Sequence, residues 1–246
     1  MPKLFLSPST QEYNPYVDGG NEEYYMNLVA DAMEPYLDAS GIMYVRNDAA
    51  GTVKNSIARS NAGDYDLHLA IHSNASPPQS AGRNRGVQVY YYSGSEKGRR
   101  AAEIIAENYK RIYPLPETVR TVATTSLAEL KGTRAPAVLI ETAFHDNPED
   151  ARWIRENIGE IAENLAQSTA QILGVPFEQP RPVRTAMVNT RFSALNLREG
   201  PSVNSRVIDR IPNGTLIPVI GRDGEWYLTK FNGKQGYVSG EYILLE

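Results

Sequence analysis

The sequence predicts an α/β domain with a mostly parallel sheet and helices on both faces, followed by a small all-β barrel or sandwich. Short apolar runs alternate with longer helical patterns over residues 1–175, which is typical of a parallel sheet. The runs are almost continuously apolar, as expected of strands buried on both faces. After residue 183 the sequence pattern changes: short runs of β-branched and aromatic residues are separated by turn signals about every ten residues.

The elements of the α/β domain can be placed in order. We expect strands at 4–6, 42–46, 66–72, 86–92 and 136–141, and helices at 22–39, 96–112 and 148–173. Asn21 is the expected N-cap of the first helix, and Pro35 is expected to kink that helix. Asn147 caps the last helix, with Pro148 at its first position.

The boundary between the two domains is expected at 176–183. A helix ends at Gly174, and three prolines in the next eight residues favour an extended, semi-rigid linker. The chain then divides into a first domain at 1–175 and a second at 184–246. Turn dipeptides such as Asn213-Gly214 and Asn232-Gly233 punctuate the second domain and predict its hairpins.

Composition excludes several classes of protein. The chain has 246 residues, 41% of them hydrophobic and 22% charged, so a folded globular protein is expected. A net charge of −4 argues against general nucleic-acid binding. Without cysteine there is neither a disulfide framework nor a thiolate metal site. No apolar run could span a bilayer, and the amino terminus lacks an apolar core of signal-peptide length. We therefore expect no membrane insertion.

Polar side chains follow the ends of three predicted strands. His72 ends one apolar run, Glu141 ends another, and Glu22 and Glu23 open the helix after the first strand. Ligands of open α/β sheets bind where strands end and helices begin. Histidine with carboxylates and an open position is the ligand set of a catalytic zinc site. A carboxylate that does not bind the metal could serve as general base.

Several of these residues also have a structural interpretation. His68 lies about 13 Å from His72 along a strand, so the two cannot share one zinc ion, and we interpret His68 as structural. Glu22 is explained by its interaction with the helix dipole, worth roughly 0.3–1 kcal/mol. His145 is expected to support the turn before the last helix. Glu141 has the weakest structural explanation, because a strand-end carboxylate beside a cleft seldom serves packing.

Four separated motifs resemble the zinc-dependent N-acetylmuramoyl-L-alanine amidases, of the family with the phosphorylase/hydrolase-like α/β fold. They are Glu-Tyr-Tyr-Met-Asn-Leu at 23–28, Ile-His-Ser-Asn-Ala at 71–75, Arg-Gly-Val-Gln-Val-Tyr-Tyr at 85–91, and Pro-Ala-Val-Leu-Ile-Glu-Thr-Ala-Phe-His-Asp-Asn at 136–147. The resemblance covers roughly the first 175 residues. It implies that Glu23 and His72 bind zinc, and that Glu141 is the catalytic base.

One motif of that family is absent. The family's first zinc ligand is a histidine in a Gly-His-Gly turn directly after the first strand, where this chain has Leu-Ser-Pro-Ser-Thr-Gln at 6–11. Thr10 stands at about the ligand position. Gln11 could offer a carbonyl oxygen as third ligand, or water could complete the site. Either substitute is a weaker ligand than imidazole, so we expect a lower affinity for zinc.

The carboxyl-terminal domain resembles a bacterial SH3 domain over nearly its whole length. Its most recognisable motif is Leu-Asn-Leu-Arg-Glu-Gly-Pro-Ser at 195–202, and Pro-Asn-Gly-Thr at 212–215 and Glu-Trp-Tyr at 225–227 follow in the usual order. Such modules commonly bind cell-wall peptides. Most of the motif residues are expected to build turns, and Trp226 is expected in the core.

Together these resemblances imply a peptidoglycan hydrolase that cleaves the amide between N-acetylmuramic acid and L-alanine at the bacterial cell wall. A phage endolysin, and a host autolysin whose signal peptide has been removed, would both fit the sequence. The alternative is an inactive amidase fold that binds the wall, which the missing histidine favours. Retention of Glu23, His72 and Glu141 favours the enzyme. A metal-free hydrolase using serine or threonine lacks a recognisable motif.

Overall fold

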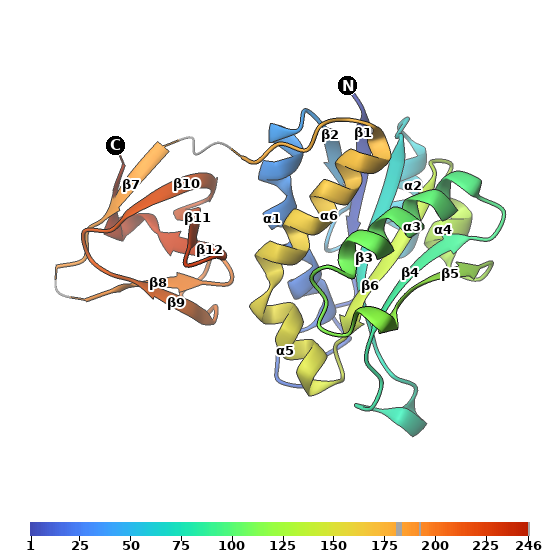
Figure 1. Cartoon of the computed structure of the whole chain (residues 1–246), viewed down its shortest axis with the longest axis horizontal. Helices are drawn as coiled ribbons and strands as arrows, with labels where there is room; N and C mark the ends of the chain where they lie inside the picture. The colour runs from blue at the N-terminus through green and yellow to red at the C-terminus, as the bar shows by residue number, and fades with distance from the viewer. Residues whose placement is uncertain (181–183, 192, 246) are drawn as a thin grey trace.

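The chain forms a larger α/β domain joined to a smaller all-β domain. Figure 1 shows the computed structural model, which describes residues 1–180, 184–191 and 193–245. Part of the predicted linker, at 181–183, and the last residue of the chain lie outside the described residues. In the described ranges, no helix is long and apolar enough to cross a membrane.

The α/β domain is built on a six-stranded sheet in the order β2-β1-β3-β6-β4-β5. Neighbouring strands are parallel except β4 and β6, which are antiparallel. The mostly parallel sheet predicted from the sequence is therefore confirmed. The strands are β1 (Lys3–Pro8), β2 (Met43–Arg46), β3 (Leu67–Asn74), β4 (Val87–Tyr92), β5 (Val119–Thr124) and β6 (Ala137–Phe144).

Helices cover both faces of this sheet, as predicted. On one face α1, α3, α5 and α6 pack over alternate strand residues such as Leu69, Ile71 and Ile140. The opposite face is covered more thinly, by α4, where Leu130 packs on Leu139. The helices are α1 (Glu22–Ala39), α2 (Val53–Asn61), α3 (Glu96–Tyr109), α4 (Ala128–Gly132), α5 (Pro148–Glu156) and α6 (Ile158–Leu173).

The structure differs from the prediction in four elements. The helix expected at 148–173 is two helices, because Asn157 leaves the helical conformation with φ −122° and ψ 23°. Its amide Nδ2 donates to Trp153 O at 2.7 Å, a side-chain bond that competes with the helical pattern. The short elements α2, β5 and α4 were not predicted.

The smaller domain is a seven-stranded antiparallel sheet in the order β13-β7-β10-β11-β12-β8-β9. Its core is made of residues such as Val188, Leu197 and Val238. Trp226, expected in this core, is only partly buried. The strands are β7 (Arg184–Val188), β8 (Leu195–Arg198), β9 (Val207–Ile211), β10 (Leu216–Asp223), β11 (Trp226–Phe231), β12 (Lys234–Ser239) and β13 (Ile243–Leu245).

The two domains are in direct contact through α1 and α6, the helices nearest the small domain in Figure 1. Tyr36 Oη on α1 donates to Gln235 Oε1 at 3.1 Å, and Gln235 Nε2 donates to Ala32 O at 3.4 Å. Lys230 pairs with Glu163 on α6 at 3.2 Å. The small domain is therefore docked on the helical layer.

We expect Gly159→Ala to loosen this docking. An added Cβ at Gly159 would lie 2.6 Å from Gln235 Cβ, whereas in an undocked chain the same change would favour α6 by up to about 1 kcal/mol. Small-angle scattering should show a larger radius of gyration and calorimetry a lower Tm. Glu160→Ala, at the exposed neighbouring position, is the control. A raised Tm with unchanged scattering for Gly159→Ala would contradict the docked arrangement.

Candidate functional site

A cleft of about 640 Å³ opens at the carboxyl ends of β1, β3 and β6. It lies on the sheet face that α4 covers, and the loops after β1 and β2 form its other walls. The polar residues that line it include Ser7, Gln11, His72, Glu129 and Glu141, together with Glu12 and Tyr13.

His72 and Glu141 meet because β3 and β6 are parallel and adjacent. The two residues are direct partners in the register, so their side chains leave the sheet on the same face. Thr142 Oγ1 donates to His72 O at 2.9 Å and ties the two strands together just beside the site. The convergence of these two strand ends, expected from the sequence, is observed.

Glu22 reaches His72 from the first turn of α1. Its Oε1 lies 2.8 Å from His72 Nδ1, and Asn14 Nδ2 donates to its Oε2 at 2.7 Å. The Glu22 side chain is 2% exposed and that of His72 12%. Asn21 caps this helix by accepting from Tyr24 N, and the cap thereby fixes where Glu22 points.

Glu23, the carboxylate assigned from the resemblance, is directed elsewhere. Its Oε1 accepts a long hydrogen bond of 3.4 Å from Asn27 Nδ2 on its own helix. Burial and the nearby charge of Glu12 raise the pKa of Glu23. The structure thus places Glu22, and not Glu23, against His72. One residue along a helix turns a side chain by about 100°, which the motif alone did not resolve.

Gln11 is brought to the site by the loop after β1. Its Nε2 lies 3.2 Å from His72 Nδ1, and its Oε1 accepts from Tyr13 Oη and Asn14 Nδ2. Gln11 therefore presents its amide nitrogen to His72. It would have to turn its amide over to offer the carbonyl oxygen considered from the sequence.

The second ring nitrogen of His72 faces another carboxylate. Glu129 Oε2 on α4 lies 3.7 Å from His72 Nε2, and Glu129 Oε1 lies 2.9 Å from His68 Nε2. His68 is fully buried, and its Nδ1 contacts Ser60 Oγ at 2.9 Å. Because His68 and His72 face the same side of β3, one short helix supplies a carboxylate to both.

These charges shift one another's pKa values. Burial alone would lower the pKa of His72, but Glu129 and Glu22 raise it to about 10. Burial would raise the pKa of Glu22, but the hydrogen bond and charge of His72, together with the hydrogen bonds from Asn14 and Ser9, lower it. Burial raises the pKa of Glu141 to about 7 in spite of His72.

The Oε2 atom of Glu141 is buried and has no hydrogen-bond partner in the described structure. A carboxyl group left unpaired inside a protein is costly. Such a group, with its pKa near neutrality and its place in an open cleft, is suited to general acid–base chemistry.

Two of these residues carry atoms that could bind a metal ion. Glu22 Oε1 and His72 Nδ1 approach to 2.8 Å, and both are atoms of the kinds that bind zinc. Within residues 1–180, 184–191 and 193–245, no group of three or more histidine, cysteine, aspartate or glutamate side chains is placed to hold a metal. The site thus offers zinc one imidazole and one carboxylate, and Gln11 would have to turn its amide over to supply a third ligand.

Two functional contacts were missed from the sequence. Glu129 carries no motif, and the only signal was a lone buried histidine, His68, that needed a polar partner. Asn14 lies in a loop whose folding the pattern did not reveal. His145 was expected to support a turn, and its Nδ1 contacts Ser73 O at 2.9 Å and Ser73 Oγ at 3.0 Å.

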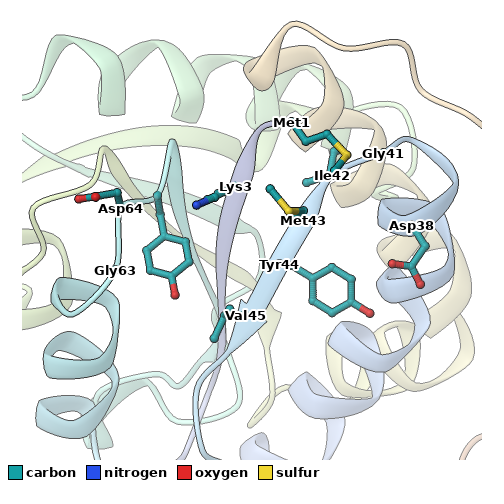
Figure 2. A pocket seen from close by; sticks show the side chains of 11 residues that line it. Met1, Lys3, Asp38, Gly41, Ile42, Met43, Tyr44, Val45, Gly63 and Asp64 are labelled. Atoms are coloured by element: carbon teal, nitrogen blue, oxygen red, sulfur yellow. The ribbon is translucent and has the colours of Figure 1, made fainter.

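A second cavity, of about 700 Å³, lies beside the edge strand β2. Figure 2 shows Tyr44, Met43 and Lys3 around it. None of the site residues predicted from the sequence lines this cavity, and it contains no histidine. The cleft around His72 is therefore the candidate active site.

Both domains match known protein families. Residues 11–171 match the family described as N-acetylmuramoyl-L-alanine amidase, and residues 193–243 match the bacterial SH3 domain. An endolysin of Bacillus phage SPP1 is 29% identical over 123 residues, which are 48% of this chain and 44% of the relative. The amidase LytC of Bacillus subtilis (strain 168) is 28% identical over 163 residues, 63% of this chain and 32% of the relative. The match thus spans less than half the length of either relative.

Solved structures show the same fold for the larger domain. The N-acetylmuramoyl-L-alanine amidase AmiC2 of Nostoc punctiforme superposes with a TM-score of 0.61 at 18% identity, covering 70% of this chain and 97% of that one. The catalytic domain of the CD27L endolysin targeting Clostridia Difficile gives a TM-score of 0.57 at 22% identity, covering 70% and 98%.

We expect Glu141→Gln to stabilise the metal-free protein in a pH-dependent way. The pKa of Glu141 is raised from 4.5 to about 7, so its ionisation opposes folding above pH 4.5 and does so fully above pH 7. The gain should be near zero at pH 4.5 and about 1–3 kcal/mol at pH 8.5. Denaturant unfolding in EDTA at both pH values measures it, and an equal change at both would contradict the buried, unpaired carboxyl.

Proposed function

The chain belongs to the N-acetylmuramoyl-L-alanine amidase family, and we propose that it hydrolyses the amide between N-acetylmuramic acid and L-alanine in peptidoglycan. The observation that carries this proposal is Glu141, a carboxylate with an unpartnered buried oxygen and a pKa of about 7. It stands beside His72 in an open cleft. The bacterial cell wall would then be the place of action.

Zinc is the metal proposed for this site, since its preferred nitrogen and oxygen ligands are present. Glu22 and His72 would hold it, with Gln11 as a weaker third group; the proposed carboxylate thus moves from Glu23 to Glu22. When bound, zinc would supply Lewis-acid polarisation of the scissile carbonyl. Asn14 keeps Glu22 in place through its bond of 2.7 Å.

The chain's own residues carry the proton transfers. Glu141 takes a proton from the attacking water, which requires the ionised carboxylate. The same carboxyl group then gives the proton to the leaving amine of L-alanine. A pKa near the working pH suits both steps.

The small domain is proposed to attach the enzyme to the wall. It packs on α1 and α6, whereas the cleft is lined by the loops after β1 and β2 and by α4. In this proposal, wall binding by the small domain and catalysis in the cleft would use separate surfaces. A second candidate function, wall binding without catalysis, is favoured by one observation: no three-membered histidine and carboxylate group is placed for a metal among the described residues.

Catalysis is tested by incubating the zinc-supplemented protein with purified peptidoglycans and following new L-alanine amino termini by mass spectrometry. The unchanged chain should release them. Glu141→Gln should be slower by at least about 10²-fold, because general base catalysis typically contributes 10²–10⁴-fold. Full activity in Glu141→Gln would refute the assigned base, and no release from any wall would leave wall binding as the function.

The two adjacent glutamates give a sharp test of the metal site. Glu22→Gln should weaken zinc binding by more than the roughly 10–100-fold typical of an outer partner, because Glu22 Oε1 lies 2.8 Å from His72 Nδ1. Glu23→Gln, one residue away, should bind zinc almost as tightly as the unchanged chain. Competition with a chromogenic chelator measures both affinities. A larger loss of zinc affinity in Glu23→Gln than in Glu22→Gln would identify Glu23 as the ligand.

A further inference from the structure

Glu129 is the buried carboxylate at this site that the proposed mechanism does not use. The residue is 4% exposed. Its Oε1 accepts from Ser7 Oγ and lies 2.9 Å from His68 Nε2, while its Oε2 lies 3.7 Å from His72 Nε2. A buried carboxylate with this many donors is held in one orientation.

Glu129 faces two imidazoles at once. Its Oε1 lies against His68 Nε2 and its Oε2 faces His72 Nε2. An ionised carboxylate beside one imidazole nitrogen favours the tautomer that carries the proton on that nitrogen. In the metal-free protein both ring nitrogens of His72 face a carboxylate, Glu22 at Nδ1 and Glu129 at Nε2. A metal held at Nδ1 together with Glu22 would leave the ring proton on Nε2, facing Glu129.

We propose that Glu129 is a positioning residue for His72, holding the imidazole proton on Nε2 so that Nδ1 is free to bind the metal beside Glu22. The inference rests on the proposed function, since it assumes a metal at Nδ1. Metal-binding histidines usually direct their second nitrogen to a carboxylate or carbonyl, and the loss of that partner typically weakens metal binding by 10–100-fold.

His68 gains a role from this arrangement. Its Nε2 holds Glu129, and its Nδ1 contacts Ser60 Oγ at 2.9 Å. Phe5 stacks on its ring with centroids 5.1 Å apart. The chain Ser60–His68–Glu129–His72 therefore runs along the sheet face that α4 covers and ends at the cleft.

The geometry separates this role from direct metal binding. Glu22 and Gln11 lie on the Nδ1 side of His72, and Glu129 lies on the Nε2 side. A single ion at one ring nitrogen cannot be reached from the other. Glu129 is thus placed to act through His72.

The test measures zinc binding by the metal-free full chain, with zinc alone and without substrate. Glu129→Gln should weaken zinc binding by roughly 10–100-fold. Asp150→Asn is the matched control: Asp150 is fully buried, 2.8 Å from Arg85 Nε and remote from His72. It should lower Tm without changing the zinc affinity. Ser7→Ala, which removes one donor and keeps the carboxylate, should give a smaller loss in the same direction as Glu129→Gln.

A second readout follows the tautomer directly. The chain has three histidines, so long-range ¹H–¹⁵N correlation spectra resolve each imidazole. Zinc-loaded protein should show His72 protonated on Nε2, and Glu129→Gln should speed exchange of that proton with water. Zinc on Nε2, or unchanged zinc affinity in both Glu129→Gln and Ser7→Ala, would overturn the proposal. Failure of the unchanged chain to bind zinc would overturn the metal site itself, and this inference with it.

Discussion

The parallel pairing of β3 with β6 determines where the chemistry of this protein can take place. It sets His72 beside Glu141, and the alternation of side chains along both strands sends Ile71 and Ile140 into the main core on the opposite face. A slip of one residue in either strand would exchange these faces and bury the charged groups among aliphatic side chains. The apolar residues of the two strands therefore hold the polar ones in place, and the register is stabilised by core packing that takes no part in catalysis.

The charge around His72 explains why the site should favour a cation. Three carboxylates surround one imidazole: Glu22, Glu129 and Glu141 all influence its pKa, which rises to about 10. In the metal-free protein a proton on His72 offsets part of this negative charge. Under the proposed function, a divalent ion takes over that compensation, and the proton stays on the nitrogen that faces Glu129. The loop after β1 lacks the histidine that the family has there, so the site has one neutral ligand fewer. Its excess of negative charge is the same. The affinity of the site then depends more on electrostatics than on the number of its ligands.

Much of the fold was predictable because its signals are local. The strand pattern around His72 and Glu141, the cap at Asn21 and the helix that follows it were all readable from the sequence and are confirmed. The break at Asn157 was not, because a single asparagine is tolerated inside many helices. Long-range contacts carried no local signal at all: Glu129 sits on a five-residue helix, and its link to His68 spans 61 positions. Whether Glu22 or Glu23 faces His72 depends on how α1 is rotated about its own axis. A motif match does not contain that information.

Helix α1 connects the two activities proposed for this chain. Its first turn supplies Glu22 to the site, and the next residue but one, Tyr24, reaches Ser205 of the small domain at 3.2 Å. About three turns further on, Tyr36 holds Gln235. The small domain therefore contacts α1, the helix that also presents Glu22, along most of the length of that helix. A module tied only by a linker would leave the cleft free to face any direction once bound to the wall. Under the proposed function, docking on α1 would instead fix the angle between the small domain and the cleft, so this interface as well as the cleft would determine which wall strands Glu141 can reach.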